Sequence, residues 1–443
     1  SAVLGSRGGR DYAGALGLRA THHTAAGLAL TACVVMVALA GVLGRDFTVV
    51  AGLCAWTAGL LLWVDVPRKT KIQSAILLLV GVLGILFGVS RQQPVPLHEA
   101  IGVNAPLIAM LAAVSFLRLI TAPPEAAAGQ APSGTRSLAS TLAGVHFFGA
   151  VVNLSTIFIM ARRMSHHDRL TRQQYMTLVR GFSSAAFWSP FFAAMAAALT
   201  YAPGARLPLL LGFGLPLALI ALALTFRDVS RLGVDDFEGY PMRLSSLWLP
   251  GLLAILILGA HAWRPDISVL GLIALLAPVV TLLTLLVRRR PLVPVLGGHL
   301  RYGLPAMRAE LMLFLAAGVM AAGLMLTVQV SAIGLPFSHF GAWEAALLVM
   351  ALVTISVLGV HPVIGIAAGA SLVAPVDPDP TLLASSFLAA WAIGVAVSPL
   401  SAMNLGLQGA YGIRPLDILR WNLPFGIAMV LVTSALFFLH PSV

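Results

Sequence analysis

Residues 359–362 (GVHP) and 398–404 (SPLSAMN) belong to a pattern that occurs twice in this chain. The earlier occurrence reads GVHFFG at 144–149 and SPFFAAM at 189–195. In both, Gly-Val-His opens an apolar segment, and a Ser-Pro pair then interrupts the next apolar segment before an Ala-Met pair. We interpret the pattern as an internal duplication whose two copies meet around one site.

The composition is that of a membrane protein. Of the 443 residues, 59% are hydrophobic and 10% are charged, and the mean hydropathy is +0.95. Many apolar runs reach the roughly 20 residues that cross a bilayer. Only helices and closed barrels satisfy their backbone groups in lipid, and these runs lack the alternation of barrel strands. The sequence therefore predicts an all-α polytopic membrane protein.

The formal charge of +11 would suggest nucleic acid in a soluble protein. Here the basic residues lie in short loops between apolar runs, which is typical of positive-inside topology and of contact with anionic lipid headgroups. We therefore expect membrane lipids and no nucleic acid as partners. Cys33 and Cys54 both lie inside predicted spans and indicate helix packing rather than a disulfide. The N-terminal segment is basic and shows no cleavable signal peptide, so we expect it in the cytoplasm, and the composition fits a bacterial inner membrane.

The positions of the arginines indicate whether the apolar run at 138–160 crosses the membrane or re-enters it as a hairpin. If it crossed, the loop after it, which contains Arg162, Arg163 and Arg169, would lie outside against the positive-inside rule. A re-entrant hairpin at 138–160 removes the conflict, and a second hairpin is predicted at 343–375. About 11 full spans remain, at 24–44, 47–65, 72–90, 98–119, 176–200, 206–226, 244–262, 267–287, 310–333, 380–412 and 421–439.

This topology makes the two copies run in opposite directions. The first hairpin opens to the cytoplasm and the second to the outside. The predicted division is an N-terminal segment with two spans (1–71), repeat 1 (72–226), a connecting loop and span (227–266) and repeat 2 (267–440). Many secondary transporters are built from such inverted repeats.

The prolines of the duplicated pattern, Pro190 and Pro399, are expected to break their helices because proline lacks a backbone N–H. The alternative is a packing kink repaired by neighbouring hydroxyl groups. A broken helix offers amides to an anion and carbonyls to a cation. The two histidines would contact substrate, carry a proton, or cap a hairpin turn. We expect substrate to bind among His146, Asn153, Ser189, Pro190, His361, Ser398, Pro399, Ser401 and Asn404, with the second copy as the more polar half.

Acidic side chains are predicted at span ends only, which disfavours a buried carboxylate relay. A coupling sodium ion would therefore need backbone, hydroxyl and amide oxygens, and a proton is the other candidate. Arg180 is predicted to snorkel to the cytoplasmic surface, although it could also draw in an anion. The stretch at 166–168 (HHD) is interpreted as a solvated loop, so neither a metal site nor a cofactor is expected.

The string GVHPVIGIAAG at 359–369, followed by SPLSAMN, resembles the ion transporter superfamily, which includes divalent anion/sodium symporters and arsenite-pump-like carriers. The likeness also rests on inverted repeats with one hairpin and one interrupted helix each. It implies an elevator-type carrier that is usually a homodimer. The chain departs from the symporters in lacking their Ser-Asn-Thr triplets, of which 153–156 (NLST) is a loose echo.

The leading hypothesis is a secondary transporter of a small carboxylate-type anion, coupled to sodium or protons, rather than an enzyme. The alternative is a membrane-embedded enzyme for a lipid or isoprenoid substrate, with His146 and His361 as acid and base. An unchanged substrate after turnover would favour the carrier, and a modified product would favour the enzyme.

Overall fold

The computed structural model describes residues 5–120, 133–152, 155–167, 169–240, 248–331 and 335–441, with side chains from residue 21 onward and except at 152, 155–156 and 248–250. Within these ranges the ordered elements are helices, and extended pairing is confined to the single bridges Ser133–Glu238 and His166–Arg169. The prediction of an all-α polytopic membrane protein is confirmed.

Nine helical stretches of the described chain are long and apolar enough to cross a membrane, and each overlaps a predicted span. The predicted span at 176–200 is absent from this set because it is divided into three short helices, and that at 244–262 lies partly outside the described residues. The nine are Thr21–Leu43, Thr48–Asp65, Arg68–Ser90, Leu97–Leu119, Leu207–Ser230, Val269–Val287, Leu292–Ser331, Pro380–Tyr411 and Pro415–Phe437.

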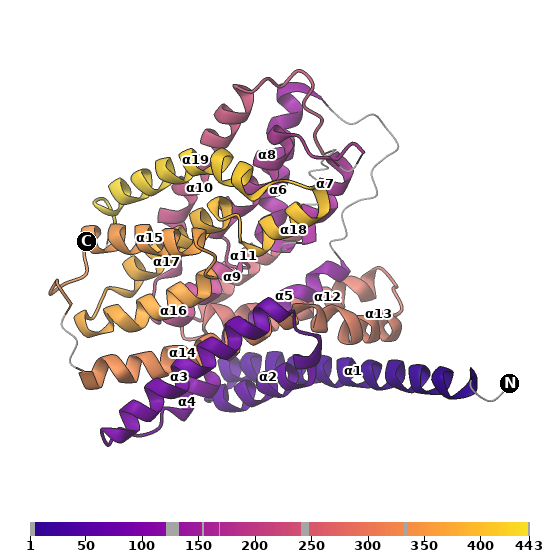
Figure 1. Cartoon of the computed structure of the whole chain (residues 1–443), viewed down its shortest axis with the longest axis vertical. Coiled ribbons are helices and arrows are strands. Elements are labelled where there is room, and N and C mark those ends of the chain that lie inside the picture. Colours follow the sequence, from indigo (N-terminus) through magenta and orange to yellow (C-terminus); the bar gives the residue numbers. More distant parts are fainter. Residues whose placement is uncertain are drawn as a thin grey trace. The chain divides into compact units, whose positions relative to one another are not determined.

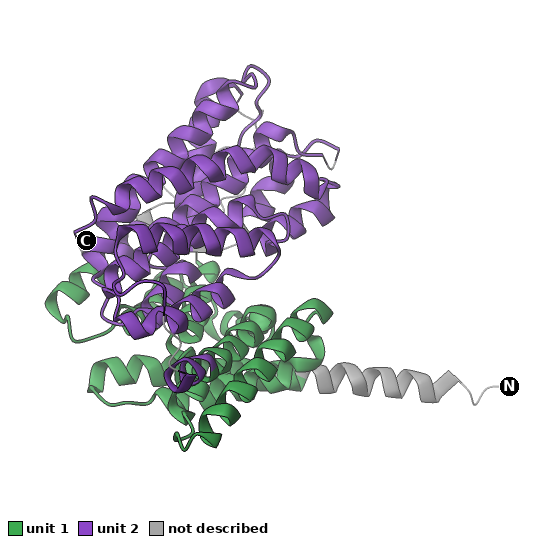
Figure 2. Ribbon diagram, turned by 60° about the vertical axis from the view of Figure 1, so that its left-hand side comes forward, with its two compact units in different colours: residues 1–120, 257–323 green, residues 121–256, 324–443 purple. Residues whose placement is uncertain are grey.

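Two compact units make up the chain, and each takes one part from each predicted repeat (Figure 2). Unit 1 comprises residues 1–120 and 257–323, and unit 2 comprises 121–256 and 324–443. The predicted repeats at 72–226 and 267–440 therefore do not coincide with the units. Each repeat begins in unit 1 and ends in unit 2.

Unit 1 packs its helices through glycines that let two backbones meet. A Cβ on Gly81 would overlap the backbone of Val319, and one on Gly27 would overlap the carbonyl of Leu300. Small residues at helix crossings are the usual means of association in membranes. The helices of unit 1 are α1 (Gly5–Leu43), α2 (Thr48–Leu62), α3 (Arg68–Ser90), α4 (Leu97–Gly102), α5 (Ala105–Phe116), α12 (Val269–Val287), α13 (Leu292–Gly298) and the first part of α14 (Arg308–Ser331).

Unit 2 is built around α17, which is the most buried of the candidate spans, with 94% of its most apolar window inside the protein. Within this unit α17 contacts α9, α10, α15 and α19 (Figure 1). The helices of unit 2 are α6 (Gly134–Val152), α7 (Ser155–Met164), α8 (Arg172–Ser183), η3 (Ser184–Phe187), α9 (Ala193–Tyr201), α10 (Leu207–Ser230), the first part of α11 (Trp248–Trp263), α15 (Ala342–Val357), α16 (Pro362–Val373), α17 (Pro380–Val397), α18 (Ala402–Tyr411) and α19 (Pro415–Phe437).

At the second predicted hairpin the chain forms a helix–turn–helix. Helices α15 and α16 contact each other and are joined by a turn in which Gly359 has φ +97°, a backbone conformation that favours glycine. At the first, α6 and α7 also contact each other, and the residues between them lie outside the described chain. Whether either pair re-enters the membrane stays a prediction.

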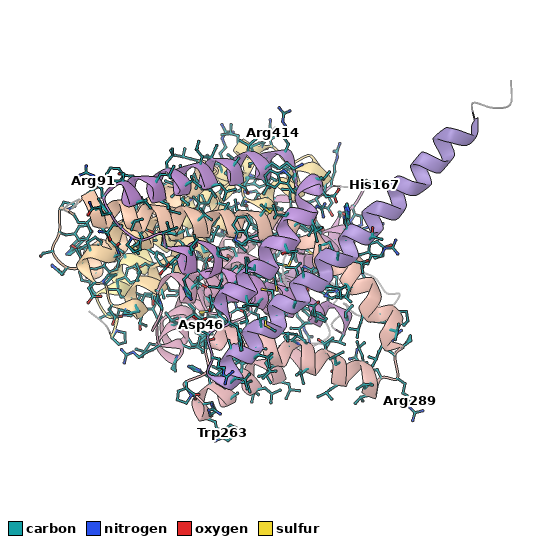
Figure 3. The ribbon with its side chains drawn as sticks, turned by 90° about the horizontal axis from the view of Figure 1, so that it is seen from below. Asp46, Arg91, His167, Trp263, Arg289 and Arg414 are labelled. Atoms are coloured by element: carbon teal, nitrogen blue, oxygen red, sulfur yellow. The ribbon has the colours of Figure 1, made fainter. Side chains whose placement is uncertain are left out.

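Charged side chains of unit 1 gather where its helices end. Asp46, Arg91 and Arg289 lie in the connections before α2, after α3 and after α12, and all three are exposed (Figure 3). The helices between them carry exposed apolar side chains instead, among them Leu79, Leu83 and Leu86 of α3. This arrangement suits helices whose flanks face lipid and whose ends face water.

Candidate functional site

Both Ser-Pro pairs interrupt a helix in unit 2, and the backbone follows the same path at each. Ser189 N donates to Ala185 O and Ser398 N donates to Gly394 O, both at 2.9 Å, as the last helical bond of the first half. The chain then turns through the proline, and the residue three after each serine donates back to the serine carbonyl, at 3.3 and 3.2 Å. This is a β-turn with proline in its preferred second position. The predicted helix breaks are therefore present.

Each serine hydroxyl donates a hydrogen bond to a backbone carbonyl of a neighbouring helix. Ser189 Oγ donates to the carbonyl of Ala150 on α6 at 2.5 Å, and Ser398 Oγ donates to the carbonyl of Ser356 on α15 at 2.6 Å. Each Oγ also accepts from the backbone N–H two residues later, at 3.2 Å in both copies. Serine is needed because its single hydroxyl both donates and accepts.

The second half-helix begins differently in the two copies. Ser401 caps α18 by accepting from Asn404 N at 3.3 Å. At the equivalent place Phe192 precedes α9 and provides no side-chain cap. Phe192, the residue before α9, therefore offers no side-chain oxygen to the positive end of this helix.

The side chain of Asn404 forms hydrogen bonds with the backbone of the second break. Its Nδ2 donates to Ser398 O at 2.8 Å and lies 3.3 and 3.4 Å from the carbonyls of Val395 and Ala396. Its Oδ1 accepts from the hydroxyl of Tyr175 on α8 at 2.7 Å. The side chain is fully buried. The polar groups that the sequence assigned to substrate at this copy thus bind the protein's own backbone.

Gln408 extends this pattern, because its Nε2 donates to the carbonyl of Pro399 at 2.5 Å. In the first copy the position of Asn404 is occupied by Met195, which has no amide. At the first break Gly214 of α10 packs against the end of the first half-helix instead, with its Cα against the carbonyl of Phe187. A Cβ on this glycine would overlap that oxygen.

His146 is buried in α6, and both of its ring nitrogens are engaged. Trp188 Nε1 donates to Nε2 at 3.0 Å, and an indole N–H can only donate. The imidazole is therefore neutral and carries its proton on Nδ1, which lies 2.8 Å from Ser184 Oγ and 3.2 Å from Gly181 O. These contacts fix the ring within its own unit.

His361 has a different setting from His146. It precedes α16, and its Nδ1 accepts from Val363 N at 3.3 Å, so it caps the start of that helix. Its ring meets Trp391 edge to face, with centroids 5.6 Å apart.

The two Gly-Val-His strings do not occupy equivalent positions. The serine bonds make Ala150 equivalent to Ser356, yet His146 lies four residues before Ala150 and His361 lies five residues after Ser356. In the structure the two Ser-Pro pairs are equivalent, and the two Gly-Val-His strings are not. A three-letter string is short enough to recur by chance in an apolar sequence, whereas Ser-Pro has a specific backbone consequence.

The remaining predicted residues are placed as follows. Pro190 and Pro399 are buried in their turns, and Ser401 is half-buried at the start of α18. Asn153 lies outside the described residues. A cavity of about 260 Å³ adjoins the first break.

Arg180 does not snorkel to the surface, and that prediction is wrong. Its side chain is 1% exposed. The guanidinium donates to Asp228 at 2.9 Å, to Asn422 at 2.9 Å and to the carbonyl of Trp421 at 2.6 Å, and it lies over the ring of Phe425. It joins α8 to α10 and α19, with its charge paired, and is not arranged to attract an anion. A buried arginine requires such partners.

In the loop at 166–169, an ion pair and a backbone bridge involve His166. His166 pairs with Glu238 at 3.0 Å, and no group of three metal-ligating side chains occurs in the described part of the chain.

Sequence reasoning missed Tyr175, Gly214 and Asn422. Gly214 and Asn422 are single small or polar residues within apolar stretches, whereas Tyr175 directly follows the polar residues Gln173 and Gln174 in α8. Their partners lie far away in the chain, 229 residues in the case of Tyr175 and Asn404.

Comparison with known proteins finds no family model that matches the chain and no match among curated proteins. Among solved structures, the chain is similar to the crystal structure of the YdaH transporter of Alcanivorax borkumensis, described as having an unusual topology. The TM-score is 0.43 with 17% sequence identity, over 77% of this chain and 85% of that one. From its own helices, the chain is a multi-pass membrane protein.

Proposed function

We propose that this protein is a secondary transporter that moves a small carboxylate-type anion across a bacterial inner membrane. The observation that carries the proposal is the pair of matched Ser-Pro breaks in unit 2, which share their turn and their serine bonds. Broken helices place backbone amides and carbonyls at membrane depth, where they are tolerated around a binding site.

The first break suits the anion better than the second. At α9 the N-cap residue Phe192 makes no side-chain hydrogen bond, so the positive dipole end of this helix would be open to a carboxylate. At α18 the hydroxyl of Ser401 already accepts from the first turn. Ser189 and Pro190 would then shape the substrate site, while Asn404 and His146 would hold its surroundings.

An elevator-type mechanism is favoured by the way the chain divides. Each predicted repeat contributes its first part to unit 1 and its second part to unit 2. Both breaks fall in unit 2, which would be the moving transport domain, and unit 1 would be the scaffold. The resemblance to the ion transporter superfamily adds a homodimer, and lipids would surround the exposed apolar flanks.

The coupling ion would be sodium or a proton. A proton would not reside on His146 in this state, because protonating Nε2 requires breaking the bond from Trp188. The same bond weighs against the enzyme alternative, in which His146 would exchange a proton with a lipid substrate. The N-terminus would be cytoplasmic.

Uptake into proteoliposomes tests the proposal. A panel of small carboxylates is offered with an imposed sodium gradient or pH gradient, and the internal compound is identified by mass spectrometry. We expect gradient-dependent accumulation of an unchanged anion. Accumulation of a chemically modified product would replace the carrier with the enzyme, and accumulation equal to that of empty vesicles for the whole panel would remove the anion proposal.

Two proline variants connect that assay to the breaks. Pro190→Ala allows helix to form through the first break and is expected to abolish uptake. Pro278→Ala, in the interior of α12 of unit 1, alters a proline that lies in neither break and is expected to preserve uptake. Equal uptake by both variants would separate transport from the break.

The topology has its own test. In a Ser165→Cys variant, the hairpin prediction places the thiol on the cytoplasmic side. Labelling by an impermeant reagent from the outside only would exclude the first hairpin.

A further inference from the structure

The cavity beside the first break lies wholly within unit 2. It encloses about 260 Å³ between α6, the Ser-Pro turn and α11. Its walls are mostly aromatic or small and aliphatic, and consist of Phe147, Ala150, Val151, Trp188, Ser189, Phe191, Gly251 and Ala254.

The polar side chains of the lining already have partners. The Ser189 hydroxyl donates to Ala150 O and accepts from Phe191 N. The Trp188 indole donates to His146. Among the eight lining residues, all of which belong to the described part of the chain, none carries a charge. A water molecule needs two to four polar partners, so this space favours hydrocarbon over water.

The residues beside the cavity on α11 are exposed and apolar. Leu252 and Ile255 alternate along the helix with the lining residues Gly251 and Ala254, and their exposed fractions are 40% and 69%. Phe147 lines the cavity and is itself 45% exposed. The cavity is therefore continuous with an apolar surface of the kind that faces lipid chains in a bilayer.

We propose that this cavity binds one acyl chain of a membrane phospholipid, which enters between α6 and α11 and ends against the first Ser-Pro turn. The occupant is a hydrocarbon chain because the described lining residues provide dispersion contacts and no free hydrogen-bonding side chain. Because this site needs only a bilayer, it does not rest on the proposed transport.

Two glycines of α11 make a matched test. A Cβ on Gly251 meets nothing within 4 Å, so Gly251→Leu extends into the cavity from its wall. Gly259 also meets nothing within 4 Å and does not line the cavity, so Gly259→Leu adds the same bulk elsewhere on the helix. Ala254→Leu is a second filling variant if Gly251→Leu does not fold.

The probe is phosphatidylcholine that carries a diazirine in one acyl chain, incorporated into vesicles with the full-length protein. After irradiation, mass spectrometry maps the label on peptides that contain 147–151 and 188–191. We expect labelling in the parent and in Gly259→Leu, and a several-fold loss in Gly251→Leu. Thermal unfolding of all three proteins serves as the folding control.

Labelling of these peptides that is absent, or that Gly251→Leu leaves unchanged, would overturn the proposal. A second arm uses a water-soluble medium-chain alkanoate with the same diazirine. If only the alkanoate labels the cavity, the occupant is the apolar part of a soluble ligand and the phospholipid assignment fails. None of these readouts depends on uptake, so a failed uptake assay and a failed lipid site remain distinguishable.

Discussion

The two Ser-Pro breaks share one backbone conformation, but different contacts cover the end of the first half-helix in each. At the first, the carbonyl of Phe187 lies against the backbone of Gly214. At the second, the carbonyl at the same distance from its serine, that of Ala396, lies near the amide of Asn404. The Ser-Pro pair thus specifies the turn, but it does not specify how the exposed end of the helix is covered. One copy relies on the close approach of a second helix and the other on a side chain.

The largest expected effect comes from Gly214→Ala at the first break. Its Cβ would overlap the carbonyl oxygen of Phe187, and backbone cannot rotate away as a side chain can. We expect a loss of about 3 kcal/mol of unfolding free energy, as for severe overpacking. Thermal unfolding in detergent measures it.

Gly212→Ala is the control in the same helix, because its Cβ would meet nothing within 4 Å. Gly426→Ala sharpens the comparison at the second break, where the added Cβ would meet the side chain of Val397 rather than a backbone oxygen. It should destabilise less than Gly214→Ala. Equal losses in Gly214→Ala and Gly426→Ala would remove the distinction between the two supports.

Asn404→Leu is the next largest change and acts on the second break alone. The substitution removes the amide from the carbonyls of Val395, Ala396 and Ser398, of which Ser398 keeps its bond from Ser401 N, and it removes the acceptor of the Tyr175 hydroxyl. Buried groups left unsatisfied give an expected loss of about 2 kcal/mol. Hydrogen exchange should rise in peptides covering 395–401 and stay unchanged in those covering 186–193. A rise in both would mean that the breaks are coupled rather than separately supported.

The two serines should behave alike, which tests the feature that the copies share. Ser189→Ala and Ser398→Ala each remove a bond to a neighbouring helix and a bond within the turn. We expect each to cost about 1.5 kcal/mol in thermal unfolding. If one variant loses unfolding free energy and the other does not, the two serines contribute unequally to stability in spite of their matched geometry.

The smallest effect is expected from Tyr175→Phe. The ring remains, and only the bond from its hydroxyl to Asn404 Oδ1 is lost, for about 1 kcal/mol. Exchange should increase at 395–401, because the amide of Asn404 is then free to rotate. The exposed Tyr302 allows Tyr302→Phe as a matched control, with no change expected. Unaltered exchange in Tyr175→Phe would mean that the carbonyls alone orient the amide.

The parts predictable from sequence are those determined by local composition or by proline. Apolar runs predicted the nine candidate spans, and Ser189-Pro190 and Ser398-Pro399 predicted both breaks. The supports were not predictable in this way. Gly214 meets a carbonyl on another helix, and Asn404 accepts from Tyr175, 229 residues earlier in the chain, so the sequence gives no sign of either pairing.

Arg180 illustrates the same limit. An arginine near the end of an apolar run is ordinarily expected at the membrane surface. Its burial depends on Asp228, 48 residues later, and on Asn422, 242 residues later. Only the fold gathers them. The prediction that His146 and His361 occupy equivalent positions has a different limit. It rested on a three-residue string that both histidines share, and a shared string does not require a shared position.

The support given by Asn404 has a consequence for how the two breaks tolerate substitution. A contact between two backbones, as at Gly214, leaves no room for a Cβ, because any side chain there would meet the carbonyl of Phe187. A side-chain amide can be exchanged for other polar groups of similar reach. We therefore expect a saturation library to retain several residue types at position 404 and glycine alone at position 214.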